Sequence, residues 1–444
     1  MEKSKVLQND VKSTAVEVTS RRDFFKKTAI YSAGALSAAS VLSPVSAKAD
    51  DPAIIKEAPW GQKLGDPVNK NLYGVPSPYE HNNIRRTHEL FSSGDPYASV
   101  SMCPIHESEG IITPNGLFFT RNHGGTAHID PNEWRLMIHG KVKKEVVLTL
   151  DDLKKYPSES RIYFIECPAN GSPEWRGPQF NSLQFMKGLM SAAQWTGVML
   201  KTILDDLGLE KDAVWMLAEG SDNASNPRTI PVEKALDDVM VVWAQNGEAL
   251  RPEQGYPVRL IVPGWEGNLN TKWLRRLEFS DKPWHSKEET SKYTMLQKSG
   301  KAIRYFWINE VNSVITSPCP EKPWTHLKKG EMVEIEGLAW SGHGTIKGVD
   351  ISFDGGDNWI EAKLKGLVLP KSWTRFSFIY KWDGKPIYLS SRAYDDFGNI
   401  QPTIDQETSA VGVESVYHRN AIVTWEITSK GECNNVQFRK HKKA

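Results

Sequence analysis

Residues 161–171 have the sequence RIYFIECPANG, and this stretch sets the fold of the middle of the chain. The run 161–165 is typical of a buried strand, and the Pro, Ala, Asn and Gly residues that follow predict a loop. Cys167 then lies just past a strand end, where a rigidly held thiolate could serve as a soft metal ligand. The alternative is a buried free cysteine acting as a small hydrophobe, and spacing alone favours it, because one cysteine is a weak signal.

Basic residues occur on both sides of this cysteine. Arg121 lies within FFTRNH at 118–123, and Lys187, Arg259 and Lys272 follow later. Charge-assisted hydrogen bonds from such groups suit a phosphate-bearing cofactor. A surface ion pair is the alternative for Arg121, and a solvated helix face is the alternative for Lys187.

The composition is that of an ordinary globular protein. The chain has 444 residues, of which 39% are hydrophobic, with 55 Lys and Arg against 54 Asp and Glu. This length predicts two or three domains, and the near-neutral charge argues against a nucleic-acid binder. Four cysteines in a chain of this length do not form a disulfide framework.

We expect an α+β domain at 100–304, preceded by an extended arm at 50–99 that is rich in Pro, Asn and Gly. Alternation predicts a strand at 134–139, and apolar runs predict buried strands at 161–165 and 257–262. Thr149 is a suitable N-cap for a helix that begins at Leu150, and Gly208 should end a short helix at 200–207.

Residues 305–430 have a different sequence pattern, which is typical of short strands. Alternating or apolar runs at 333–336, 349–353, 376–380, 387–393 and 422–427 are separated by turn signals such as DGGD at 354–357. With almost no helical pattern between them, they predict an immunoglobulin-like β-sandwich. The basic tail at 431–444 is expected to fray.

The first 49 residues have the layout of a bacterial export signal. A twin-arginine head, Arg21 and Arg22, precedes a short apolar stretch and the small-x-small sequence AKA at 47–49. The stretch is too short and too rich in Ser and Gly to span a membrane. This pattern predicts twin-arginine export to the periplasm; the alternative is a solvated charge pair before a surface helix.

Several cofactor motifs are missing from the sequence. It contains no G-x-G-x-x-G after a strand, no phosphate-loop lysine motif, and no C-x-x-C or C-x-x-C-H. We therefore expect no covalent haem in this chain. A redox enzyme built this way needs a compact cofactor and a separate protein that accepts its electrons.

Taken together, FFTRNH at 118–123 and ECPAN at 166–170 resemble the sulfite oxidase family of mononuclear molybdenum enzymes. Within that family the chain is most similar to the molybdenum subunit of sulfane dehydrogenase, from the periplasmic Sox thiosulfate-oxidising system. Further matching segments are PVR at 257–259, PG at 263–264, KWL at 272–274, VNSVITS at 311–317, AWSG at 339–342 and DDFGNIQP at 395–402.

The resemblance implies a molybdopterin-binding domain at 100–304 and an immunoglobulin-like dimerisation domain at 305–430. It makes Cys167 the protein ligand of one molybdenum per chain, and it places Arg121, Tyr293 and Lys187 at the substrate. For Tyr293 the alternative is ordinary packing, because its flanking residues match poorly. The residues implied to hold the molybdopterin are Phe118, Phe119, Thr120, Arg121, Asn122, His123, Asp222, Gln254, Arg259, Asn270, Thr271 and Lys272.

The sequence also departs from the family pattern. Gly171 and Ser172 stand where typical sulfite oxidases have two arginines, and Lys292 replaces the aspartate before the pocket tyrosine. The pocket arginine that the family draws from its C-terminal domain has no clear match at 411–419. Because arginine forks suit a small dianion such as sulfite, fewer arginines favour a sulfur chain tethered to a carrier protein.

The resemblance therefore implies oxidation of carrier-bound sulfane sulfur by oxygen-atom transfer, with a c-type cytochrome subunit as electron acceptor. The C-terminal domain should form a homodimer, which the cytochrome could extend to a heterotetramer. The main alternative is a sulfite:cytochrome c oxidoreductase on the same fold. The sequence also leaves open a molybdenum-dependent reductase of nitrate or methionine sulfoxide, and an exported binding module without molybdenum.

Overall fold

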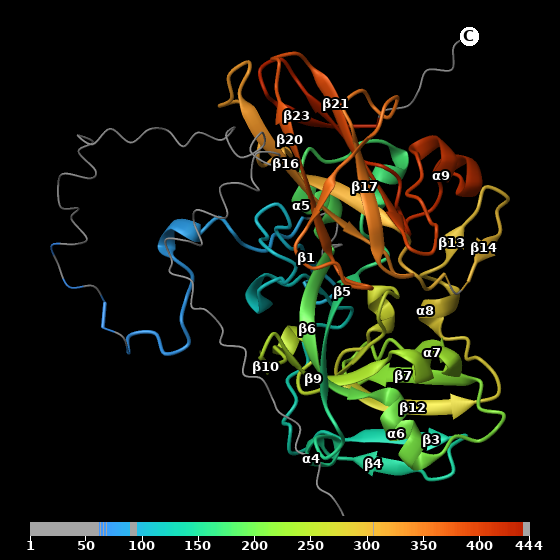
Figure 1. Cartoon of the computed structure of the whole chain (residues 1–444). Coiled ribbons are helices and arrows are strands. Elements are labelled where there is room, and N and C mark those ends of the chain that lie inside the picture. The colour runs from blue at the N-terminus through green and yellow to red at the C-terminus, as the bar shows by residue number, and fades with distance from the viewer. Residues whose placement is uncertain are drawn as a thin grey trace, which may run out of the picture. The chain divides into compact units, whose positions relative to one another are not determined.

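The computed structural model describes residues 62, 64, 66, 67, 69–88, 96–304 and 306–437. The expected export signal at 1–49 lies outside these residues. The chain divides into two units, 1–75 and 76–444, and the second unit carries the helices and strands described below (Figure 1). Among the described residues of the first unit, Lys70 forms an ion pair with Asp66 at 2.8 Å.

The second half of the expected arm contains little regular structure in its described part. A 3-10 turn at Pro78–Glu80 is followed by an isolated bridge between Arg86 and Met102. The backbone then forms a two-stranded sheet from β1 (Val100–Ser101) and β2 (Thr120–Arg121). No helix in the described part of the chain is long and apolar enough to cross a membrane.

One five-stranded sheet carries the cysteine loop. Strand β5 ends at Glu166, directly before Cys167, and its register with β6 pairs Glu166 with Met190. The order is β10-β9-β6-β5, with β11 paired to β9. Its strands are β5 (Glu159–Glu166), β6 (Met190–Met199), β9 (Met240–Gln245), β10 (Glu248–Ala249) and β11 (Arg259–Ile261). The strands expected at 161–165 and 257–262 are both present.

A second five-stranded sheet has the order β4-β3-β12-β7-β8, with β3 and β12 parallel. Its strands are β3 (Leu136–Gly140), β4 (Val146–Leu148), β7 (Trp215–Gly220), β8 (Arg228–Pro231) and β12 (Leu274–Ser280). Helices α6 (Leu200–Leu207) and α7 (Val232–Asp237) share a buried apolar core with it. Mixed sheets with a few short helices confirm the α+β prediction.

The helices of this domain are short, and α4 (Leu150–Leu153), α5 (Leu183–Lys187) and α8 (Lys287–Thr290) start at side-chain caps. Thr149 caps α4 and forms a capping box with Asp152. Gly208 follows α6 as expected from the sequence. A hairpin of β13 (Met295–Leu296) and β14 (Ala302–Ile303) follows α8.

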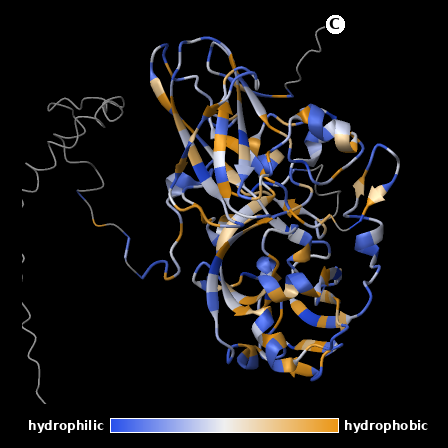
Figure 2. Ribbon diagram, turned by 45° about the vertical axis from the view of Figure 1, so that its right-hand side comes forward, coloured by the Kyte–Doolittle hydropathy of each residue, from blue (hydrophilic) through white to orange (hydrophobic). Residues whose placement is uncertain are grey.

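The C-terminal domain consists of two antiparallel sheets that enclose an apolar core, and this confirms the predicted sandwich. Figure 2 shows apolar and polar residues alternating along its strands. The first sheet contains β15 (Asn312–Ser317), β16 (Met332–Trp340), β19 (Lys363–Lys365) and β20 (Thr374–Lys381). The second contains β17 (Ile346–Ser352), β18 (Ile360–Glu361), β21 (Ile387–Asp395), β22 (Thr424–Ile427) and β23 (Cys433–Val436).

Two elements of this domain differ from the sequence-based expectation. The segment expected to fray from residue 431 instead contributes β23, which pairs with β22. The polar sequence of β23 gives no strand pattern, so the strand could not be predicted from it. Tertiary contacts fix the strand instead, since the Asn435 backbone N–H donates to Asn181 Oδ1 at 2.7 Å. A helix, α9 (Ile404–Val411), also forms where none was expected, capped by Thr403.

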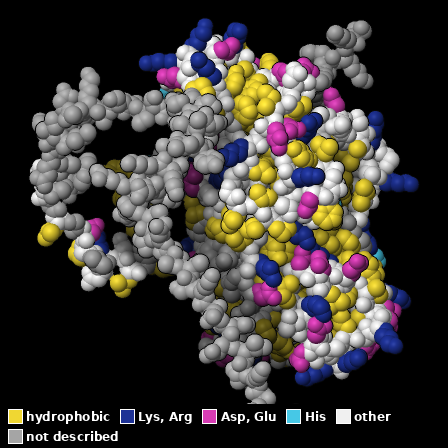
Figure 3. Space-filling view, in the orientation of Figure 1, with side chains coloured by type: hydrophobic (Ala, Val, Ile, Leu, Met, Phe, Trp, Pro, Cys, Tyr) yellow, Lys and Arg dark blue, Asp and Glu magenta, His cyan; other side chains and the backbone are white. Residues whose placement is uncertain are grey.

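The two domains are joined by a continuous core. Buried residues of β5 and β6 belong to the same apolar cluster as those of the sandwich. The Trp340 indole N–H donates to Glu166 Oε2 at 2.7 Å, so the sandwich contacts the residue next to Cys167. On the face shown in Figure 3, Lys and Arg side chains are interspersed with Asp and Glu, in keeping with the near-neutral composition.

Candidate active site

A cleft with about 710 Å³ of atom-free space brings most of the sequence-predicted site residues together. Those that line it are Phe118, Phe119, Arg121, Asn122, His123, Cys167, Asp222, Gln254, Arg259, Asn270, Thr271, Lys272 and Tyr293. Thr120 lies just behind the lining, where its hydroxyl accepts hydrogen bonds from Arg85 at 2.8 Å and Gln254 at 3.2 Å. Lys187 is the predicted residue that the structure does not bring here.

Cys167 is held at the end of β5 by its backbone. Its N–H donates to Leu189 O, and its carbonyl accepts from Asn170 N–H, both at 2.9 Å. The side chain is 7% exposed, and burial raises the pKa of the thiol to about 11. Without a cation the thiol is therefore protonated at neutral pH, and a metal that binds the sulfur must displace this proton.

Arg121 is fixed by carbonyl groups around its guanidinium. It donates from Nη1 to Ala98 O at 2.8 Å and to Asn122 O at 2.5 Å. Nη2 lies 3.4 Å from His123 Nδ1. The positive charge of Arg121 also lowers the pKa of Cys167, although burial has the larger, opposite effect. Arg121 is thus positioned to favour negative charge in the cleft.

His123 and Tyr293 form a hydrogen-bonded pair, with 2.7 Å between Nε2 and the phenol oxygen. Burial and the charge of Arg121 lower the pKa of His123 to about 3, so the imidazole is neutral. Arginine has only donors, which makes Nδ1 the acceptor and Nε2 the protonated nitrogen. His123 then donates to Tyr293, and the phenol proton is left to donate into the cleft.

Two buried basic side chains, Arg259 and Lys272, also line the cleft. Arg259 is 3% exposed and donates to Gln254 O at 3.1 Å and to Asn270 O at 3.0 Å. The Lys272 ammonium donates to Arg121 O and Glu253 O, both at 3.0 Å, and to the Asn122 side chain. Burial lowers the pKa of Arg259 to about 9 and that of Lys272 well below its usual value. An anion beside them would offset this cost.

Several buried polar atoms of the cleft have no hydrogen-bond partner among the residues that the structure describes. They are Asn226 Oδ1, Arg259 Nε, Asn268 Oδ1 and Thr271 Oγ1. Buried polar groups are nearly always satisfied, so these atoms indicate a polar ligand in the cleft. A pterin, with its ring amides and phosphate, fits this set of donors and acceptors.

Six lining residues were not predicted from the sequence, namely Ile165, Ser225, Asn226, Gly267, Asn268 and Trp273. Ile165, Gly267, Asn268 and Trp273 are close in sequence to predicted residues, and that proximity was the available signal. Ser225 and Asn226 instead belong to a turn with positive φ at both positions. They too are close in sequence to a predicted residue, Asp222.

Lys187 faces the C-terminal domain. It is 1% exposed, and its ammonium donates to Arg419 O at 3.1 Å. Burial lowers its pKa to about 8, against an opposing effect of Glu166. The C-terminal end of α5 packs away from the cleft, so the structure gives Lys187 no contact with a substrate there.

Comparisons with known proteins match both domains. A family described as the oxidoreductase molybdopterin binding domain matches residues 123–288, and the Mo-co oxidoreductase dimerisation domain matches residues 304–425. The crystal structure of the sulfane dehydrogenase SoxCD from Paracoccus pantotrophus aligns with a TM-score of 0.85 at 44% identity. That alignment covers 88% of this chain and 99% of the matched chain.

Curated relatives are more distant. The mitochondrial sulfite oxidase of Rattus norvegicus is 30% identical over 355 residues, which is 73% of this chain and 63% of that protein. The NADH nitrate reductase of Ulva prolifera is 27% identical over 390 residues, 79% of this chain and 42% of that protein. This chain therefore spans less than two thirds of the length of these two relatives.

Proposed function

This chain belongs to the sulfite oxidase family of molybdopterin oxidoreductases, and we propose that it oxidises sulfane sulfur bound to a carrier protein. The observation that carries the proposal is the convergence of Cys167, Arg121 and Tyr293 in one cleft with two buried cations. The 44% identity to a sulfane dehydrogenase chain supports the choice of substrate class.

Molybdopterin, when bound, supplies oxygen-atom transfer to sulfur and the accompanying two-electron redox change. The buried Arg259 and Lys272 would hold its phosphate, and Asn226, Asn268 and Thr271 would bond to its ring system through their unsatisfied atoms. Cys167 would bind the metal once its proton has left. The environments of the two basic side chains favour an anionic neighbour, and the three unsatisfied atoms favour a polar one.

Two side chains of the cleft, Arg121 and Tyr293, would stabilise charge and donate hydrogen bonds around the substrate sulfur. Arg121 favours the deprotonated form of Cys167 and any negative charge on the substrate. Tyr293 can donate its phenol proton into the cleft, because neutral His123 supplies the hydrogen bond to its oxygen. These two donors would orient the reacting sulfur and stabilise charge that develops on oxygen.

The proposed preference for sulfane sulfur over sulfite rests on arginines of typical sulfite oxidases that this chain lacks. Gly171 and Ser172 replace two arginines of typical sulfite oxidases, and Arg419 is paired with Glu407. Free sulfite would therefore meet fewer arginines than in typical sulfite oxidases, whereas a carrier protein would add affinity through its own contacts.

We further propose that the protein works in the periplasm after twin-arginine export and passes its electrons to a c-type cytochrome subunit. It would form a homodimer through the C-terminal domain. The dimerisation-family match and the SoxCD alignment support an assembly with partners. Cofactor insertion before export is consistent with a buried site assembled from both sheets.

The decisive assay uses the purified, cofactor-loaded protein with its cytochrome on two substrates. We expect carrier-bound persulfide to be oxidised with a kcat/KM at least about tenfold above that for sulfite, a difference of about 1.4 kcal/mol in transition-state binding. Equal or faster oxidation of sulfite would contradict the sulfane proposal and favour a sulfite dehydrogenase.

A further inference from the structure

A segment of the C-terminal domain, residues 412–421 between α9 and β22, runs past the cysteine loop of the catalytic domain. The His418 backbone N–H donates to Pro168 O at 2.8 Å, one residue from Cys167. His418 Nε2 lies 2.9 Å from Glu266 Oε1, and both side chains are buried. Sandwich residues thus reach the loop that would hold the metal.

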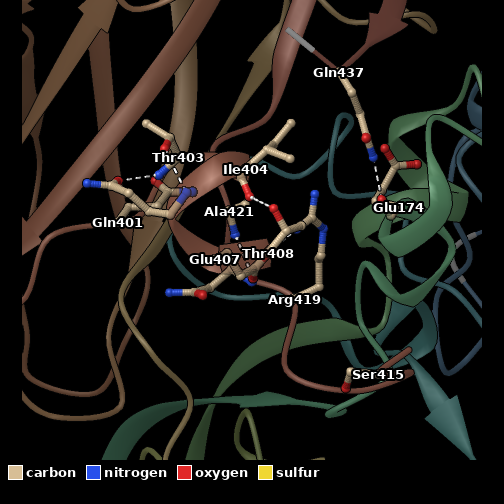
Figure 4. A network of polar contacts seen from close by, with 12 residues as sticks. Glu174, Gln401, Thr403, Ile404, Glu407, Thr408, Ser415, Arg419, Ala421 and Gln437 are labelled. Carbon is tan, nitrogen blue, oxygen red and sulfur yellow. Dashed lines mark hydrogen bonds and ion pairs between the residues drawn. The ribbon is translucent and has the colours of Figure 1, made fainter. Parts of the chain in front are cut away.

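This segment is firmly anchored (Figure 4). Glu407 of α9 accepts hydrogen bonds from the backbone of Asn420 at 2.9 Å and Ala421 at 3.2 Å, and it pairs with Arg419. Lys187 adds a bond to Arg419 O from the catalytic domain. A loop held at this many points presents its remaining side chains in a fixed position.

Tyr417 is the side chain that this segment brings to Tyr293. The ring centroids are 5.2 Å apart with an interplanar angle of 36°. Tyr293 lines the same cleft as Cys167, and Tyr417 packs against Tyr293 from the C-terminal domain. The segment's arginine does not reach the cleft, since the Arg419 guanidinium lies over Trp175 at 5.0 Å.

We propose that Tyr417 is a specificity-determining residue, which with Tyr293 forms an aromatic wall that selects a polarisable sulfane chain over sulfite. Sulfur makes favourable contacts with aromatic rings, whereas a hydrated dianion gains little from them and requires cations. The C-terminal domain thereby contributes an aromatic ring to the site in place of a cation. This inference rests on the proposed sulfane activity and names the residue responsible for it.

The test compares Tyr417→Ala and Tyr417→Phe with the wild-type holoenzyme on carrier-bound persulfide and on sulfite. Tyr417→Ala should lower kcat/KM for the persulfide about tenfold and leave that for sulfite within about twofold, because only the sulfur chain loses a contact. Tyr417→Phe keeps the ring and should retain the wild-type ratio of kcat/KM for persulfide to kcat/KM for sulfite. Tyr388→Ala, on strand β21 of the same domain, is the matched control and should change neither value.

A second measurement is independent of turnover. Calorimetric titration with a peptide that carries a blocked trisulfide should give a Kd about tenfold weaker for Tyr417→Ala and unchanged for Tyr417→Phe. Molybdenum content and the thermal midpoint of each variant establish that it is folded and loaded.

The outcomes separate the two proposals. A wild-type enzyme that oxidises only sulfite overturns the sulfane function and, with it, the role of Tyr417. A wild-type enzyme that prefers persulfide, with the same preference and the same peptide Kd in Tyr417→Ala, overturns the role of Tyr417 alone.

Discussion

At the scale of single residues, the proposed function makes Cys167 the ligand of the metal. Its thiol has a pKa of about 11 because it is buried, so in the absence of metal the sulfur is neutral and unreactive. A metal offsets the cost of deprotonation through its bond to sulfur, and binding should release a proton. In this proposal the remaining side chains of the cleft would contact this sulfur or the cofactor.

Cys167→Ser should abolish oxidation of both persulfide and sulfite, because an alcohol is a far poorer ligand for a soft metal than a thiolate. The stability of the fold should change little, since the substitution is nearly isosteric. Steady-state assays and a thermal unfolding curve check this. Clearly measurable activity of the variant on either substrate would contradict the ligand assignment.

Arg121→Ala should mainly reduce kcat/KM, by roughly 100-fold, because it removes a fixed positive charge beside the reacting sulfur. Arg121→Lys is the control: it keeps the charge but loses the fork that contacts Ala98 O and His123. We expect the kcat/KM of Arg121→Lys to lie between those of the wild type and Arg121→Ala. Equal activity of both variants and wild type would show that Arg121 has no role at the substrate.

At the scale of elements, local signals predicted the strand at 161–165, the helix at 200–207 and the sandwich strands. They failed for β23, because its Asn residues carry no apolar pattern and the contacts of Asn435 with Asn181 and Glu174 join segments far apart in the sequence. The same limit applies to the site. Motif residues from 118–123 were predicted, whereas Asn226 and Tyr417 come from turns whose role exists only in the folded chain.

The loop after Cys167 has its own steric constraint. Gly171 has φ 80°, and a Cβ at this position would lie 3.0 Å from Lys187 Nζ and 3.3 Å from Arg419 Cβ. A side chain at this position would therefore crowd Lys187 and Arg419 unless they shift.

Gly171→Ala should lower the free energy of unfolding by more than the ~1–2 kcal/mol cost of a left-handed alanine. The matched control is Gly247→Ala, which has the same φ of 80° but no atom within 4 Å of the new Cβ. Denaturant unfolding of both variants measures the difference. Equal destabilisation would show that crowding by Lys187 and Arg419 is absent.

At the scale of the whole molecule, buried charges connect the two domains. Lys187 contacts the backbone of the segment that carries Tyr417, and Glu166 beside Cys167 accepts from Trp340 of the sandwich. A continuous apolar core accompanies these bonds. The sandwich is therefore part of the active site's support.

Stability should depend on pH through Lys187. Its folded pKa of about 8 lies below the ordinary 10.5, so the unfolded chain binds more protons between these values and stability rises with pH there. Across this range of pH, the free energy of unfolding of the wild type should rise by up to about 3 kcal/mol relative to that of Lys187→Met. Urea unfolding at several pH values checks it, and parallel pH profiles for the two proteins would contradict it.

Every role assigned to the cleft depends on a bond between the sulfur of Cys167 and molybdenum. X-ray absorption at the molybdenum edge, on the loaded wild type and on Cys167→Ser, counts the sulfur neighbours of the metal. We expect one sulfur neighbour fewer in the variant. An unchanged sulfur shell, or a wild-type protein that matures without molybdenum, would show that this bond does not exist.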